Sequence, residues 1–127
     1  MVHTVTFDPD GEQLKVKLTF TGLMVASYTF TLWSAEDNSQ VMCESGNNQN
    51  PADDDYDLPE PAAANDGRLI QVRTELLALD AGIGQPYAVR AEVFQGGEGP
   101  LPEVAEDAGK LTGKAQSSLL FVCLKSA

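Results

Sequence analysis

The sequence predicts an all-β protein, an antiparallel β-sandwich of about seven to eight strands. Apolar and polar residues alternate with period two over several segments, and clusters of Gly, Pro, Asn and Asp separate these segments. No segment shows the apolar spacing of a convincing amphipathic helix. A chain of 127 residues fits one domain, 1–127, and is long enough to bury a core without disulfides or metals.

The clearest strand is 14–21, where Leu, Val or Phe at even positions alternate with Lys or Thr at odd positions. This pattern is typical of a half-buried strand in an antiparallel sheet. The turn residues of 8–11 just before it favour a hairpin with 4–7. Further strands are predicted over 26–33, 40–43, 68–77, 87–93 and 117–125.

The last of these strands is apolar on both faces over 119–124, so we expect it in the centre of a sheet. Between it and the preceding strand, 95–107 is expected as a loop because it is rich in Gly and Pro, and 103–114 as polar chain with one helical turn or none. The strand pattern fits immunoglobulin-like, C2-like and jelly-roll topologies equally well.

A long acidic insert, 44–67, interrupts the strands. No Lys or Arg occurs from Leu18 through Gly67, and nine of the nineteen acids fall within 36–66. Long connections without secondary structure are uncommon in compact domains and are usually functional or disordered. Because the alternation resumes at Arg68, we expect a long acidic loop that interrupts one sandwich rather than a linker between two domains.

Asp53, Asp55 and Asp57 are the candidate metal ligands of this insert. Carboxylates at alternate positions can converge on one Ca²⁺ ion, which takes six to eight oxygen ligands. The rest of an EF-hand loop is missing, because Leu58 stands at the required Gly and Ala64 at the required Glu. Calcium is therefore the one cofactor that the pattern suggests, and a solvated acidic loop is the alternative interpretation.

Three apolar side chains are the candidate partner-binding residues. Tyr56 and Leu58 give the acidic insert two anchors that either dock on a partner or pack back on the sandwich itself. Trp33 has the opposite parity to Tyr28 and Phe30, so it points away from the core. It either anchors a partner or is covered by a loop.

The net charge of −11 argues against a nucleic-acid partner and against an anionic membrane surface, since both require clustered Lys and Arg. No apolar run is long enough to span a membrane, so we expect no membrane insertion. The first residues lack the basic and apolar regions of a signal peptide. A cytoplasmic location is expected, although a mature secreted fragment would have the same sequence.

Catalytic motifs are lacking, so we expect no enzymatic activity. His3 is the only histidine, and there is no nucleophile elbow or complete phosphate-binding loop. Cys43 and Cys123 are the only cysteines. Spacing alone leaves open whether they are buried thiols or a disulfide.

These observations predict a non-enzymatic binding module with a protein partner, possibly a basic one, contacted through the loops 44–67 and 95–107. The first alternative is a Ca²⁺-assisted module for carbohydrate or lipid. The second is a self-assembling structural protein joined through an edge strand such as 40–43. The sequence leaves the oligomeric state open.

Overall fold

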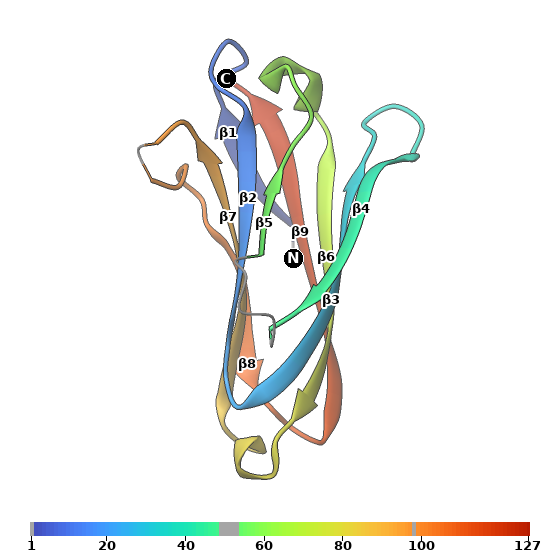
Figure 1. Cartoon of the computed structure of the whole chain (residues 1–127), viewed down its shortest axis with the longest axis vertical. Helices are drawn as coiled ribbons and strands as arrows, with labels where there is room; N and C mark the ends of the chain where they lie inside the picture. The colour runs from blue at the N-terminus through green and yellow to red at the C-terminus, as the bar shows by residue number, and fades with distance from the viewer. Residues whose placement is uncertain (1, 49–53, 98) are drawn as a thin grey trace.

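Two β-sheets packed face to face make up the protein (Figure 1). The computed structural model describes residues 2–48, 54–97 and 99–127, and these residues form nine strands and two short 3₁₀ helices. The elements are β1 (Val2–Phe7), β2 (Leu14–Thr21), β3 (Met24–Trp33), β4 (Gln40–Asn47), β5 (Asp54–Asp57), η1 (Ala62–Asn65), β6 (Leu69–Ala78), η2 (Asp80–Gly82), β7 (Pro86–Gln95), β8 (Ala105–Lys110) and β9 (Ala115–Ser126). The strand order is β1-β9-β6-β3-β4 in the five-stranded sheet and β5-β2-β7-β8 in the four-stranded sheet. The predicted all-β sandwich is confirmed.

The period-two alternation places one face of each long strand in the core. In β2, Leu14, Val16 and Leu18 are at most 3% exposed, while Lys15 between them is exposed. β3, β6, β7 and β9 follow the same pattern. Neither helix among the described residues is long and apolar enough to cross a membrane.

The predicted hairpin between 4–7 and 14–21 is wrong. β1 instead pairs with β9, in parallel, at the edge of the five-stranded sheet, while β2 lies in the four-stranded sheet. The connection 8–13 does turn, with the Gly11 amide donating to the Asp8 carbonyl. The Gln95 side chain of β7 bonds to both the amide and the carbonyl of Asp8, and so holds the turn against the four-stranded sheet. The chain therefore crosses between the sheets here, a distance of roughly 10 Å.

The prediction of a long loop over 44–67 is wrong for most of the residues that the structure describes there. β4 continues to Asn47, β5 joins the four-stranded sheet beside β2, and η1 follows β5. The acidic insert thus crosses from the edge of one sheet to the edge of the other.

The segment 103–114, expected to have no strand, contains β8, which pairs with β7. β8 begins inside the predicted loop 95–107. Its inward positions are Ala105, which is buried, Asp107, which accepts a hydrogen bond from the Ser118 hydroxyl, and Gly109. Small and polar residues at inward positions leave no apolar alternation, so the sequence pattern missed the strand.

Candidate functional site

Tyr56, a predicted partner-binding residue, points between the two sheets. Its ring stacks on Phe30 with centroids 4.9 Å apart and meets Tyr28 edge-on at 6.4 Å. The Tyr28 hydroxyl donates to Asp54 at 2.8 Å, and because it has only one proton, the Tyr56 hydroxyl donates to Tyr28. Burial raises the pKa of Tyr28 far above its ordinary value, and burial also raises the pKa of Tyr56. Tyr56 therefore ties β5 to β3 and is not free to anchor a partner.

Leu58, the second predicted anchor, is fully buried. Its amide donates to the Leu14 carbonyl at 2.9 Å, and its carbonyl accepts a hydrogen bond from the Gln13 side chain at 2.8 Å. Of the two outcomes expected for Tyr56 and Leu58, packing back on the sandwich describes both residues. Leu58 belongs to the core and offers no surface to a partner.

Asp55 and Asp57, two of the predicted metal ligands, lie on the outer face of β5, opposite Lys17 and Lys15 of β2. The Lys15 Nζ lies 3.8 Å from the Asp57 Oδ1. Cross-strand opposite charges therefore account for the Asp-x-Asp spacing without a metal ion. The third candidate, Asp53, lies outside the described residues. Across 2–48, 54–97 and 99–127, no three His, Cys, Asp or Glu side chains are grouped to hold a metal ion.

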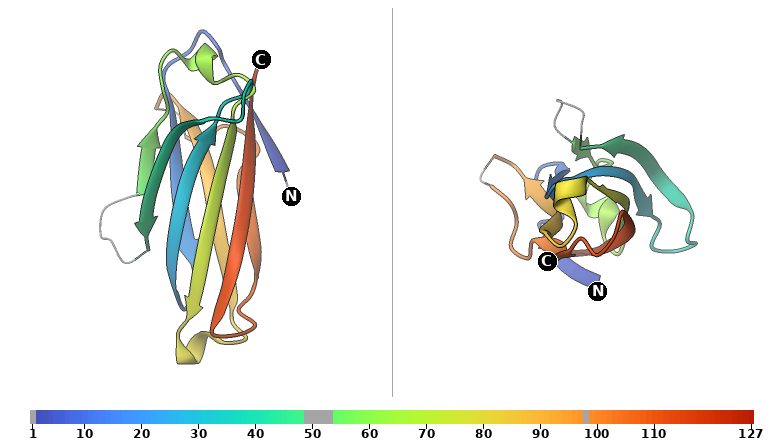
Figure 2. Two further views of the ribbon diagram at one scale, coloured as in Figure 1. Left: turned by 90° about the vertical axis from the view of Figure 1, so that its right-hand side faces the viewer. Right: turned by 90° about the horizontal axis from the view of Figure 1, so that it is seen from below.

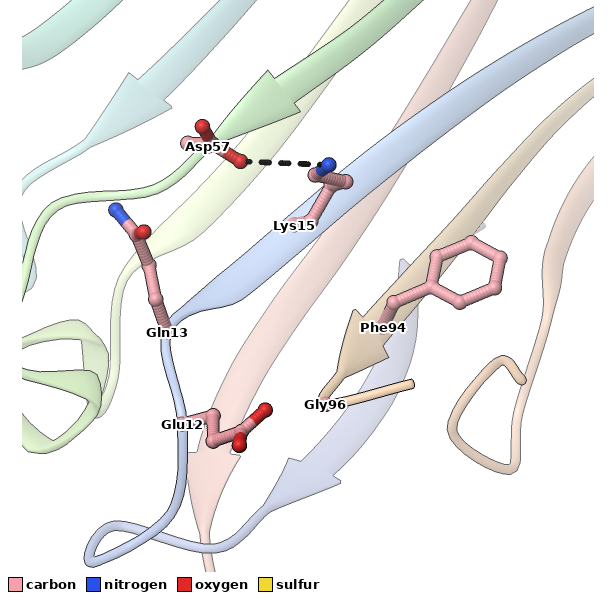
Figure 3. A pocket seen from close by; sticks show the side chains of 6 residues that line it. All are labelled: Glu12, Gln13, Lys15, Asp57, Phe94 and Gly96. Atoms are coloured by element: carbon pink, nitrogen blue, oxygen red, sulfur yellow. Dashed lines mark ion pairs between the residues drawn. The ribbon is translucent and has the colours of Figure 1, made fainter. Parts of the chain in front are cut away.

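The whole outer face of the four-stranded sheet is charged in this paired manner. Its described outward side chains include four cations and four anions, namely Lys15, Lys17, Arg90, Lys110, Asp55, Asp57, Glu92 and Glu106. A hollow of about 460 Å³ lies at one end of this face, lined by Glu12, Gln13, Lys15, Asp57, Phe94 and Gly96 (Figure 3). Its one cation is already paired with Asp57, and both side chains are at least half exposed. An anionic ligand would have to displace a hydrated ion pair here.

The outer face of the five-stranded sheet differs sharply. Its described outward side chains include only three charges, Arg73, Glu75 and Lys125, and the first two pair with each other at 3.6 Å. Apolar side chains occupy adjoining positions on it. We call this group the apolar face; its members are Val2, Trp33, Leu69, Leu119, Phe121 and Cys123.

The register makes the apolar face continuous across four strands. Val2 of β1 lies opposite Phe121 of β9, and Leu69 of β6 lies between Cys123 of β9 and Trp33 of β3. The left view of Figure 2 looks onto this sheet. Val2 is 59% exposed and Leu119 47%. β9 is thus central, as predicted, but it is apolar on both sides because its outer side belongs to this surface.

Both cysteines are free thiols on this outer side, Cys43 exposed on β4 and Cys123 half-buried on β9. β6 and β3 lie between these two strands. Three strand spacings of about 4.8 Å separate the cysteines by far more than the roughly 7 Å that a disulfide allows. The expectation that both thiols are buried is wrong, and the disulfide alternative fails on distance.

Trp33 is half-buried and lines a second hollow of about 420 Å³, the Trp33 pocket, whose lining residues are Trp33, Ser34, Ala35, Asn38, Gly67 and Leu69. The indole Nε1 donates to the Gln71 side chain at 2.9 Å, which fixes the ring on the sheet. The acidic insert does not line this pocket apart from Gly67, the last residue of the predicted insert. Trp33 therefore points outward, as predicted, and part of its surface stays open.

Acidic residues adjoin the Trp33 pocket in the chain. Asp37, in the turn between β3 and β4, accepts hydrogen bonds from the Ser39 hydroxyl and amide, which lower its pKa. Asp66, next to Gly67, accepts a hydrogen bond from the Ser126 amide, which lowers its pKa as well. Both carboxylates are ionised at neutral pH, so the open Trp33 ring lies at an acidic end of the molecule.

Comparison with protein-family models, curated proteins and solved structures gave no match to this chain. The evidence on function is therefore the geometry of its own surfaces.

Sequence reasoning missed two parts of this arrangement. Asp54, between the predicted ligands, is the acid that Tyr28 binds, and its parity with Tyr56 along β5 was the available signal. Leu119 and Phe121 were assigned to a doubly buried strand, yet their parity is opposite to that of the core residues Leu120 and Val122. That apolar odd-numbered face was the signal for an exposed surface.

Proposed function

We propose that this chain is a non-enzymatic binding module whose protein partner docks on the apolar face. The observation that carries this is a continuous apolar surface, on a sheet with three outward charges, in a chain of net charge −11. Water-soluble proteins rarely leave a large contiguous apolar patch uncovered, and such patches commonly mark interaction sites. The paired charges on the opposite sheet show what an ordinary hydrated face of this protein looks like.

The partner has an apolar centre and a basic rim. Trp33 supplies a large aromatic side chain of the kind that dominates binding energy at interfaces. The acids next to it, Asp37 and Asp66, favour basic residues on the partner. A second copy of the chain is disfavoured, since two molecules of net charge −11 repel each other.

This docking uses a sheet face instead of the predicted contact loops. The anchors of 44–67 are buried, and Leu101 in 95–107 packs against the core. Trp33 is the one predicted partner-binding residue that keeps this role.

A second candidate function is pairing through β4, the edge strand predicted for self-assembly. β4 is at the edge of the five-stranded sheet, and in its eight residues Glu44 is the only charge and there is no proline. Edges with so little protection invite strand addition. The product would be a continuous sheet between two molecules.

A photo-crosslinking residue placed at Leu119, in the cells that make the protein, tests the docking surface. The matched control is the same residue at Ala108, which is exposed on the outer face of the four-stranded sheet. We expect a discrete adduct with another protein at position 119 only, and its loss when Phe121→Asp is added to a chain that still melts cooperatively. Equal labelling at both positions, or none at 119, contradicts the proposal. An adduct of two copies would instead indicate self-assembly.

A further inference from the structure

We propose that the Trp33 pocket receives a Lys or Arg side chain of the partner. This rests on the proposed function, because it assigns the partner's basic character to one place on the docking surface. Three features of the pocket carry the inference: its walls, its surrounding charge and the fixed indole.

The walls suit the aliphatic stem of a long basic side chain. Trp33, Leu69 and Ala35 are apolar, and the volume of about 420 Å³ lies within the range of ligand pockets, about 300–1,000 Å³. Gly67 has φ 79°, and a Cβ at this position would lie 3.1 Å from the Ala35 Cβ. Glycine at 67 therefore keeps this wall of the pocket open, and any larger residue would be strained there.

The surrounding charge suits the cationic head. Glu36, Asp37 and Asp66 are each adjacent in sequence to a lining residue. Two cations lie near this end: the Arg68 guanidinium donates to Asn65 at 3.1 Å, and Lys125 interacts with Asp66 and lowers its pKa. Lys125 thus partly offsets Asp66, and Glu36 and Asp37 are left as the carboxylates that face an incoming cation.

The indole supplies the third attraction. Its N–H is satisfied by Gln71, so a guest meets the ring as an apolar and π surface rather than as a hydrogen-bond donor. Aromatic faces attract the guanidinium and ammonium groups, and Trp does so best. A neutral apolar side chain would gain from the walls alone, so a cation is the better occupant.

Trp33 is the only tryptophan, so its indole N–H gives one unique NMR signal. The probes are N-acetyl-arginine amide, its neutral isostere N-acetyl-citrulline amide, and N-acetyl-norleucine amide for the stem alone. We expect the arginine derivative to shift the indole signal saturably at millimolar concentration, and the two neutral probes to shift it several-fold less. Glu36→Gln is expected to weaken binding about two- to fivefold, the range for one exposed charge pair. The control Glu106→Gln, on the other sheet, leaves binding unchanged.

Equal shifts with the charged and neutral probes, or no shift with any, would overturn the assignment. The same holds if salt raised from about 20 to 500 mM left arginine binding by the native chain unchanged, since this screens exposed charges. Crosslinking at position 119 together with no arginine binding removes only the basic side chain from the pocket. Arginine binding without crosslinking removes the docked protein partner and leaves a cation-binding pocket.

Discussion

Replacing Leu58 by alanine separates an insert that is part of the core from an acidic loop lying on the surface. Leu58 is fully buried, and its amide and carbonyl are both hydrogen-bonded to the start of β2. These bonds hold the backbone in place, so the cavity left by the missing methyl groups cannot close easily. Leu→Ala changes in cores cost about 2–5 kcal/mol, and we expect about 3 kcal/mol here.

That loss is a large share of the roughly 5–15 kcal/mol by which domains of this kind are stable. It should lower Tm by about 10 °C for a chain of this length. Urea unfolding followed by tryptophan fluorescence measures the change in the free energy of unfolding directly. Leu79→Ala is the matched control, because Leu79 is 50% exposed, and its effect should stay within about 0.5 kcal/mol. A Leu58→Ala variant as stable as that control would show that the insert does not contribute to the core.

Three further outcomes are expected. Because burial raises the folded-state pKa of Tyr28, its contribution is present below the unfolded pKa of about 10 and is lost as pH rises above it, so Tyr28→Phe should show a smaller fall in Tm than the native chain between about pH 9 and 11.5. The folded-state pKa of Asp66 is lowered, so its contribution is present above the unfolded value of about 3.9 and is lost as pH falls through the folded value; Asp66→Asn should flatten the Tm profile below about pH 4.5, and a slope equal to that of the native chain would exclude this origin. Lys17 lies between Asp55 and Glu92 in neighbouring strands, so Lys17→Glu should cost about 0.5–1 kcal/mol and Asp55→Lys should restore part of it, which a double-mutant cycle in urea measures; additive effects would show that the two sites are not coupled.

The sequence predicted those elements whose evidence is local. Alternation in 14–21, 26–33 and 68–77 placed each strand within a few residues and assigned the correct inward face, including an outward Trp33. These predictions succeeded because a half-buried strand records its burial in its own residues.

Strand partners, in contrast, depend on residues distant in the chain. The turn after Phe7 signals a reversal of direction but not the sheet that receives the next strand. Asp55 and Asp57 suggested metal ligands because the lysines that face them lie on β2, far earlier in the sequence. The apolar face combines residues from β1, β3, β6 and β9, so only the sheet order brings it together.

The parallel pairing of β1 with β9 also has a mechanical consequence. Six residue pairs, from Val2 with Phe121 to Phe7 with Ser126, join the two strands in register. Pulling on the start of β1 and the end of β9 slides the strands along each other, because these points lie at opposite ends of a parallel pair (Figure 1). The load then falls on all the inter-strand hydrogen bonds together, whereas a hairpin pulled at its open end loses its bonds one at a time. Stretched between these points, the sandwich should unfold at high force in a single step, and its resistance would reflect the unfolding rate of this one pair of strands.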